Sequence, residues 1–226
     1  MNFLLIKEHL VVLRVHHWLK NILIFSPLLL SHQFDFNSIN KALIAFLAFS
    51  LVASLVYIIN DIRDIEFDRL HATKSLRPIA SGKISPSSIS YLIIALVILS
   101  VLFSLKVNTS FGKVLIIYFL LALLYTYGLK KIIYLDLIIL TSFYIIRIFS
   151  GGVAIDAVVT GWLIIFSFFL FLSLAAIKRI TEIQKYSDSD LRKMGKSYTS
   201  SNLDNLYALT KLSQLIALVM LSLYIL

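Results

Sequence analysis

Cysteine is absent from this sequence of 226 residues, so disulfide bonds and thiolate metal sites are both excluded. Charge is also scarce: Asp, Glu, Lys and Arg make up 15% of the chain, against roughly a quarter in a soluble domain. Seven glycines and three prolines are too few for a flexible linker or a low-complexity segment. These absences exclude an ordinary soluble globular protein.

Apolar residues dominate instead: 59% of the chain is hydrophobic and the mean hydropathy is +0.91. Because a helix needs about 20 apolar residues to cross the bilayer core, the apolar runs predict an all-α, polytopic transmembrane helix bundle in a single domain. Residues 3–18 are expected to form an interfacial helix that leads into the first span. The seven predicted spans are 19–33, 42–60, 89–106, 112–129, 132–150, 161–178 and 206–226.

Positive charge is unevenly distributed between the predicted loops. The net charge of +9 is compatible with nucleic-acid binding, but the basic residues lie in short loops between apolar runs, which is typical of membrane topology. Seventeen of the 21 lysines and arginines lie in the N-terminal segment, in loops 61–88 and 178–211, and at Lys130–Lys131. We therefore expect a multi-pass protein of the plasma (inner) membrane, with these segments cytoplasmic and no nucleic acid bound.

Four acidic residues gather where the second predicted span ends, within Asn60–Arg69. At about 100° per residue, Asp61, Asp64 and Asp68 fall on one helical face, and Glu66 points away. Three carboxylates on one face repel each other unless a cation neutralises them. Mg²⁺ commonly combines one or two carboxylates with water and substrate phosphate, so the pattern predicts a magnesium site. A solvated helix end, with the carboxylates paired to a neighbouring arginine, is the alternative interpretation.

Basic residues follow the acidic cluster directly, and two further basic groups lie on the same predicted side of the membrane. Cations beside carboxylates can hold the outer oxygens of a diphosphate whose inner oxygens a metal holds. A loop that merely obeys the topology rule would explain the sign of these charges, and residues 178–182 can also form a helix end with an internal ion pair. The candidate binding residues in these groups are Lys20, Asn21, Arg69, His71, Lys74, Arg77, Lys178, Arg179 and Glu182.

One cation, Arg147, lies inside the fifth predicted span, where a charge is costly. We expect it to face the interior of the bundle and to find a partner there. Asp136 precedes it by about three helical turns, some 16 Å along the axis, so the two residues need not pair directly.

These motifs, taken in order, resemble the UbiA superfamily of intramembrane prenyltransferases. Asn60–Asp68 followed by Arg77-Pro78-Ile79-Ala80-x-Gly82 is similar to the first aspartate-rich motif of that superfamily. The second cytosolic region, which begins at Lys178-Arg179, lacks the D-x-x-x-D motif of the aromatic prenyltransferases. The similarity is greater to the branch of decaprenyl-phosphate phosphoribosyltransferases, through Trp18-x-Lys20-Asn21, Asp68-Arg69-x-His71-x-x-Lys74, Tyr125-Thr126-x-x-Leu129-Lys130, Leu135-Asp136, Arg147 before Gly151-Gly152, Lys178-Arg179-x-x-Glu182 and Ser197-Tyr198-Thr199.

The resemblance implies transfer of a 5-phosphoribosyl group from phosphoribosyl diphosphate to a polyprenyl phosphate, with diphosphate released and Mg²⁺ as cofactor. The acceptor phosphate is already ionised at neutral pH, so no general base is required. Asp61, Asp64 and Asp68 would bind the metal and act in catalysis. The superfamily has nine spans, so the chain is expected to lack the last two. The implied substrate-binding residues are Lys20, Asn21, Asn60, Arg69, His71, Lys74, Arg77, Tyr125, Lys130, Arg147, Lys178, Arg179 and Glu182.

Two other functions stay open on the sequence. A prenyltransferase of the same superfamily would bind a prenyl diphosphate at the aspartates and pass its prenyl group to an aromatic acceptor; His71, Lys74 and the missing second aspartate motif weigh against it. A transporter or structural membrane protein would perform no chemistry. Transporters tend to place charges near the midplane at interrupted helices, whereas nearly every charge here lies at one interface.

Overall fold

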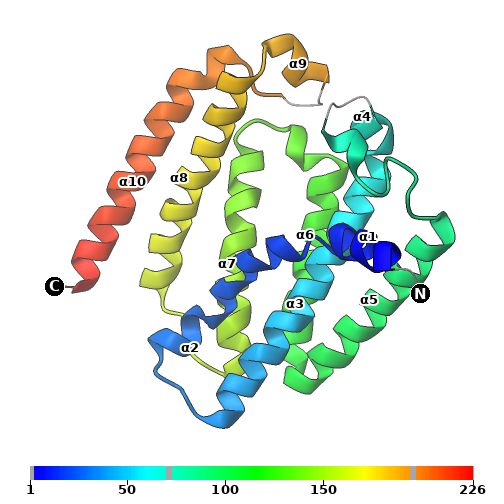
Figure 1. The fold of residues 1–226 in the computed structure, drawn as a ribbon. Helices are drawn as coiled ribbons and strands as arrows, with labels where there is room; N and C mark the ends of the chain where they lie inside the picture. Colours follow the sequence, from blue (N-terminus) through cyan, green and yellow to red (C-terminus); the bar gives the residue numbers. More distant parts are fainter. Residues whose placement is uncertain (1–2, 70–72, 194–196, 226) are drawn as a thin grey trace. The chain divides into compact units, whose positions relative to one another are not determined.

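The computed structural model describes residues 3–69, 73–193 and 197–225, and the regular structure within these ranges is helical throughout (Figure 1). The chain forms two compact units, Met1–Ala122 with Ser150–Ala157, and Leu123–Phe149 with Val158–Leu226. In the described ranges, six helices are long and apolar enough to cross a membrane: Phe36–Arg63, Pro86–Val107, Thr109–Tyr127, Leu135–Ile155, Gly161–Lys185 and Ser200–Tyr224. The predicted fold class, a polytopic transmembrane helix bundle, is confirmed.

Helix α3 (Phe36–Arg63) is the centre of the first unit and contacts α1, η1 and α5. It begins at Asp35, whose carboxylate accepts a hydrogen bond from the Ser38 backbone N–H at 3.0 Å. Alanines and serines recur on its buried faces, and such small side chains let neighbouring helices approach closely. Its partners in this unit are α1 (Phe3–Leu13), η1 (Val15–Phe25), α2 (Ser26–Leu30), α4 (Ile65–Arg69), η2 (Lys74–Leu76), α5 (Pro86–Val107) and most of α6 (Thr109–Tyr127).

The first predicted span, 19–33, is wrong as a regular transmembrane helix. This part of the chain is the 3₁₀ helix η1 followed by the short helix α2, and Pro27 in the first turn of α2 has no N–H with which to continue an unbroken helix. A 3₁₀ helix rises about 2.0 Å per residue against 1.5 Å for an α-helix. The eleven residues of η1 therefore extend about 22 Å, farther than an α-helix of equal length.

The helix η1 runs antiparallel to α3, and its side chains are hydrogen-bonded to serines of α3. Trp18 Nε1 donates to Ser54 Oγ at 3.0 Å, and Asn21 Nδ2 donates to Ser50 Oγ at 2.9 Å. Ser54 Oγ in turn donates to the backbone oxygen of Leu13 at 2.7 Å. Polar groups buried in apolar surroundings are costly unless they are paired, so these contacts allow the irregular segment to lie against α3.

The second unit contains the end of α6, η3 (Leu129–Lys131), most of α7 (Leu135–Ile155), α8 (Gly161–Lys185), α9 (Asp188–Lys193), η4 (Ser200–Asn202) and α10 (Leu203–Ile225). Helices α8 and α10 lie side by side (Figure 1, yellow and orange to red). Thr160 begins α8 by accepting a hydrogen bond from the Leu163 N–H at 3.3 Å. The core of this unit draws residues from α7, α8, α9 and α10, among them Leu137, Leu172, Ala176, Ile180, Leu191 and Leu206.

Gly151 lies against the backbone of Ile24 in η1 and gives a test of the packing of η1. A Cβ built on Gly151 would overlap the carbonyl group of Ile24. Because backbone cannot move aside cheaply, we expect Gly151→Ala to destabilise the fold by about 1–3 kcal/mol or more, seen as a lower thermal unfolding midpoint in detergent. Gly161→Ala, where a Cβ meets open space, is the control. An unchanged midpoint for Gly151→Ala would contradict this packing.

Candidate functional site

The acidic cluster spans the junction between α3 and α4 in the first unit. Helix α3 ends at Arg63, and Asp64 has a turn conformation, yet the hydrogen bonding continues: Asp64 N–H donates to the Asn60 oxygen at 2.9 Å, and Asp68 N–H to the Asp64 oxygen at 2.8 Å. Helical periodicity therefore survives the break. Asp61 and Asp68 are buried at 5% and 3% exposure, whereas Glu66 is exposed. The prediction that Glu66 points away from the buried acidic face is confirmed.

Two arginines neutralise the buried carboxylates. Arg77 Nη1 bridges them, at 2.6 Å from Asp68 Oδ2 and 3.1 Å from Asp61 Oδ1. Arg14 Nη2 lies 2.6 Å from the same Asp61 oxygen, and its guanidinium lies 5.0 Å from the centre of the Tyr57 ring. The Arg77 side chain is 29% exposed, so this ion-pair cluster is enclosed on the carboxylate side and open to solvent at its cations.

The donor set of this cluster suits a hard divalent cation. Asp61 and Asp68 converge on a single nitrogen of Arg77, which shows that their oxygens can share one cation. Two carboxylates are a common protein contribution to a Mg²⁺ site, the remaining positions being filled by water and substrate. Across residues 3–69, 73–193 and 197–225, no group of three or more His, Asp or Glu side chains is arranged to hold a metal ion. The predicted third ligand, Asp64, is partly exposed.

The other predicted binding residues of the first unit have different surroundings. Asn21 is buried and donates to Ser50, so it takes part in the packing of η1 on α3. Arg69 Nε donates to the Ala80 backbone oxygen at 3.0 Å, which ties α4 to the turn that closes at Gly82 with φ +74°. Lys20 is exposed, Asn60 and Lys74 are partly buried, and His71 lies outside the described residues.

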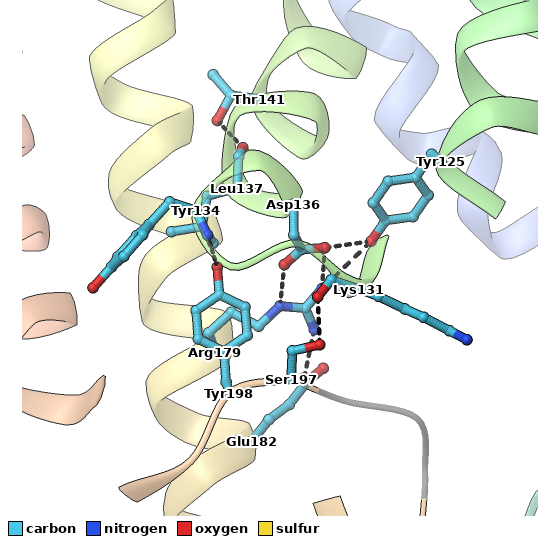
Figure 2. Close-up of polar contacts among 10 residues, drawn as sticks. All are labelled: Tyr125, Lys131, Tyr134, Asp136, Leu137, Thr141, Arg179, Glu182, Ser197 and Tyr198. Carbon is cyan, nitrogen blue, oxygen red and sulfur yellow. Dashed lines mark hydrogen bonds and ion pairs between the residues drawn. The ribbon is translucent and has the colours of Figure 1, made fainter. Parts of the chain in front are cut away.

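A second charged cluster lies in the second unit, around Arg179 of α8 (Figure 2). Its guanidinium makes two hydrogen bonds to Asp136, Nε to Oδ2 at 2.6 Å and Nη2 to Oδ1 at 2.8 Å. Nη1 donates to Glu182 Oε2 at 2.5 Å, one turn along the same helix. The Tyr125 hydroxyl, at the end of α6, donates to Asp136 Oδ1 at 2.7 Å. Asp136 therefore joins the predicted residues Tyr125 and Arg179, and Arg179 in turn holds the predicted Glu182.

The segment before α10 closes this cluster. The Tyr198 hydroxyl accepts a hydrogen bond from the Tyr134 backbone N–H at 2.8 Å, and the Tyr198 ring centre lies 5.9 Å from the Arg179 guanidinium. Burial raises the pKa of the Tyr198 phenol to about 12, so the hydroxyl stays neutral at physiological pH. Ser197 Oγ donates to the backbone oxygen of Lys131 (Figure 2).

The other predicted binding cations of the second unit differ in their exposure to solvent. Arg147 is buried at 4% exposure; its Nη1 donates to the Phe143 backbone oxygen at 2.5 Å, and its guanidinium lies 5.8 Å from the Tyr144 ring centre. The prediction that it faces the interior is confirmed within this unit. Lys178 is exposed and Lys130 is partly exposed.

Sequence reasoning missed Arg14, Asp136 and Tyr198 as members of these clusters. Asp136 stood in a recognised motif, and its position at the start of an apolar run was the available signal. Arg14 had a weaker signal, because helical periodicity gives the face of a residue but not the cation that lies opposite.

Comparison with known proteins identifies the family to which this chain is similar. A family model described as the UbiA prenyltransferase family matches residues 22–226. The uncharacterized protein y4nM of Sinorhizobium fredii is 38% identical over 181 residues, 80% of this chain and 35% of that protein. The decaprenyl-phosphate phosphoribosyltransferase of Mycolicibacterium smegmatis is 35% identical over 205 residues, 87% of this chain and 64% of that protein. The chain thus spans between about a third and two thirds of the length of these relatives.

Solved structures share the fold at lower sequence identity. A UbiA homolog from Archaeoglobus fulgidus bound to GPP and Mg²⁺ superposes with a TM-score of 0.74 at 21% identity, over 94% of this chain and 77% of that one. A structure titled for digeranylgeranylglyceryl phosphate synthase gives a TM-score of 0.75 at 23% identity, over 95% and 75% of the two chains.

Arg77 gives a test of the charge balance in the first cluster. Arg77→Gln leaves Asp61 and Asp68 close together without their shared cation. Removing one partner of a fully buried ion pair costs about 3–5 kcal/mol; because Arg77 is partly exposed, we expect about 2 kcal/mol, measured as denaturant or thermal stability in metal-free buffer. Lys83→Gln breaks an exposed pair with Glu8 at 3.5 Å and should cost less than about 1 kcal/mol. Equal effects of the two variants would contradict the burial argument.

Proposed function

This chain belongs to the UbiA prenyltransferase family, and we propose that it transfers a 5-phosphoribosyl group from phosphoribosyl diphosphate to a polyprenyl phosphate, releasing diphosphate. Relatives at 32–35% identity carry the name decaprenyl-phosphate phosphoribosyltransferase, which supports this choice of donor and acceptor. The six apolar helices support an acceptor that is a membrane lipid.

The observation that carries the proposal is the convergence of two buried carboxylates on one cation at the end of α3. We assign Asp61 and Asp68 as the residues that would hold Mg²⁺, with Asp64 as a third candidate ligand. Bound there, the ion would neutralise the negative charge that develops on the diphosphate leaving group. An anion that reaches the same edge also meets the guanidinium groups of Arg14 and Arg77, whose planar donors match phosphate oxygens.

The remaining substrate contacts stay predictions. Four predicted residues of the first unit are charged or carry an amide group and are at least partly exposed. We propose that these residues contact phosphate oxygens of the substrates: Lys20, Asn60, Arg69 and Lys74. In the second unit we propose the same role for Lys130 and Lys178, the two predicted binding lysines there, which are partly exposed and exposed, respectively. No general base is invoked, because the acceptor phosphate is ionised at neutral pH.

The orientation in the membrane follows from the charge distribution. We propose that residues 61–88 and 178–211 lie on the cytoplasmic side, where a soluble sugar diphosphate such as phosphoribosyl diphosphate is available. The chain has no cysteine, so single thiols at the exposed positions Ser87, Ser189 and Asn37 can be probed separately in intact cells. Ser87→Cys and Ser189→Cys should be protected from an impermeant reagent and Asn37→Cys labelled; the reverse pattern would reject this orientation.

A two-arm assay in membranes that contain the protein tests the proposed reaction. One arm supplies phosphoribosyl diphosphate labelled in the ribose together with polyprenyl phosphate; the other supplies labelled prenyl diphosphate with an aromatic acid. We expect label to enter the lipid fraction in the first arm and to require Mg²⁺. Product in the second arm alone would make the protein an aromatic prenyltransferase and reject the proposal.

Substitution of the carboxylates tests the assigned roles. Asp61→Asn and Asp68→Asn keep the side-chain size and remove one negative charge each, so we expect the rate to fall about 10²–10³-fold, the usual scale for losing a principal electrostatic group. Mg²⁺ should also stop raising the thermal midpoint of these variants. Asp64→Asn decides whether the third carboxylate takes part.

Glu66→Gln is the matched control for these carboxylate variants, because it removes the same charge from an exposed position two residues from Asp68. Its rate should stay within about twofold of the unaltered protein. If Glu66→Gln is as damaging as Asp68→Asn, the assignment of the buried pair fails.

A further inference from the structure

The Arg179 guanidinium is engaged by carboxylates at all three of its nitrogens. Nε and Nη2 donate to Asp136, and Nη1 donates to Glu182. Lys178, the preceding residue of α8, also interacts electrostatically with both carboxylates, so two cations and two carboxylates balance in this group. A phosphate could bind Arg179 only by displacing a carboxylate that is already hydrogen-bonded to it. The cluster is therefore suited to hold the chain together and unsuited to receive an anion.

Burial supports the same assignment. The Asp136 side chain is fully buried and that of Arg179 is 3% exposed, whereas Glu182 at the outer end of the cluster is 27% exposed. The two-point contact between Arg179 and Asp136 fixes both the distance and the relative orientation of the two side chains. Because Asp136 lies in the first turn of α7, the contact joins the start of α7 to α8.

The turn between α6 and α7, residues 128–134, is attached at several points around this pair. At its start, the Tyr125 hydroxyl donates to Asp136. At its end, the Tyr134 backbone N–H donates to the Tyr198 hydroxyl. Between them, the backbone oxygen of Lys131 accepts a hydrogen bond from Ser197 (Figure 2). The turn is thus held from two directions, and its side chains include the cations Lys130 and Lys131.

We propose that Asp136 and Arg179 are a positioning pair: they fix the turn 128–134, so that its lysines meet an anionic phosphate group at a defined place, and Arg179 itself binds no substrate. The part of this inference that concerns the phosphate rests on the proposed function. Ser197 and Tyr198 complete the attachment from the segment before α10. A conservative exchange of arginine for lysine cannot reproduce a two-point contact to one carboxylate together with a third bond to another.

Spin labelling of the turn tests the positioning role without any substrate. Ile132 lies in the turn and is 50% exposed; because the chain has no cysteine, a nitroxide on Ile132→Cys reports on this position alone. We expect a restricted spectrum in the otherwise unaltered protein, and a mobile spectrum when Arg179→Lys, Arg179→Gln or Asp136→Asn is added. A label on Leu215→Cys, exposed on α10, should be unaffected by these changes. A restricted spectrum at Ile132→Cys in all three variants would overturn the proposal.

Kinetics separate positioning from direct binding. A positioning role predicts that Arg179→Lys raises KM for polyprenyl phosphate about as much as Arg179→Gln does, by roughly 10–100-fold, the usual effect of losing a partner that orients a ligand-binding group. Direct binding predicts that Arg179→Lys keeps most of the affinity because the charge is retained. That second outcome, with an unchanged nitroxide spectrum, would also overturn the proposal.

Tyr198→Phe keeps the test decisive if the charged variants fail to fold. It removes the acceptor of the Tyr134 N–H and no charge, and it should mobilise the Ile132→Cys label partly. An unchanged spectrum in Tyr198→Phe would count against the attachment. Because the spectra need no substrate, failure of phosphoribosyl transfer in the unaltered protein would reject the proposed function and leave the positioning pair to be judged from the spectra.

Discussion

A carboxylate buried among apolar helices must be matched by a cation, and this constraint accounts for the main long-range connections in each unit of the protein. An unpaired charge in a low-dielectric interior costs several kcal/mol. Asp61 and Asp68 meet the requirement through Arg14 and Arg77, and Asp136 meets it through Arg179. In each case the partner is arginine, whose planar group can serve two acceptors at once while remaining charged.

Each pairing connects segments that are far apart in the sequence. The contact between Arg14 and Asp61 links the junction of α1 and η1 to the end of α3, and Arg14 itself has a left-handed backbone conformation, with φ 51°. Such a conformation is unfavourable for a residue with a side chain, so its persistence depends on surrounding contacts. Trp18 and Asn21 continue the attachment along α3. The 3₁₀ helix therefore lies where a regular transmembrane helix would otherwise be expected.

The sequence is informative wherever a single periodicity or charge pattern decides the outcome. Apolar runs predicted the six helices that are long and apolar enough to span a membrane, and the motif order predicted the family that the family model confirms. The helical spacing placed Asp61, Asp64 and Asp68 on one face and Glu66 away from it. In the structure Asp61 and Asp68 are buried, Asp64 is partly exposed and Glu66 is exposed. The regular helix predicted over 19–33 was wrong, because hydropathy measures burial and does not distinguish an α-helix from a 3₁₀ helix.

Ion pairs between residues on different helices could not be predicted from the sequence. Arg179 was expected to bind substrate because it lies in a basic motif on the positive side of the membrane. Its contact with Asp136 joins residues 43 positions apart, and no local pattern contains that information. The same holds for Arg14 and Asp61, which are 47 positions apart. Helical faces follow from one sequence segment, whereas ion pairs depend on which two faces the fold brings together.

The two charged clusters differ in how far their ion-paired side chains are exposed to solvent. In the first cluster the charges of two carboxylates and two guanidinium groups balance. The bridging Arg77 is 29% exposed, so water, a metal ion or a phosphate can reach the cluster without opening the core. In the second cluster Arg179 and Asp136 are almost wholly enclosed, with side chains 3% and 0% exposed. Displacing either partner there would leave a buried charge unpaired, at a cost of several kcal/mol. We therefore propose that the same two residue types serve ligand exchange at one site and fixed geometry at the other, and that access to solvent separates the two roles.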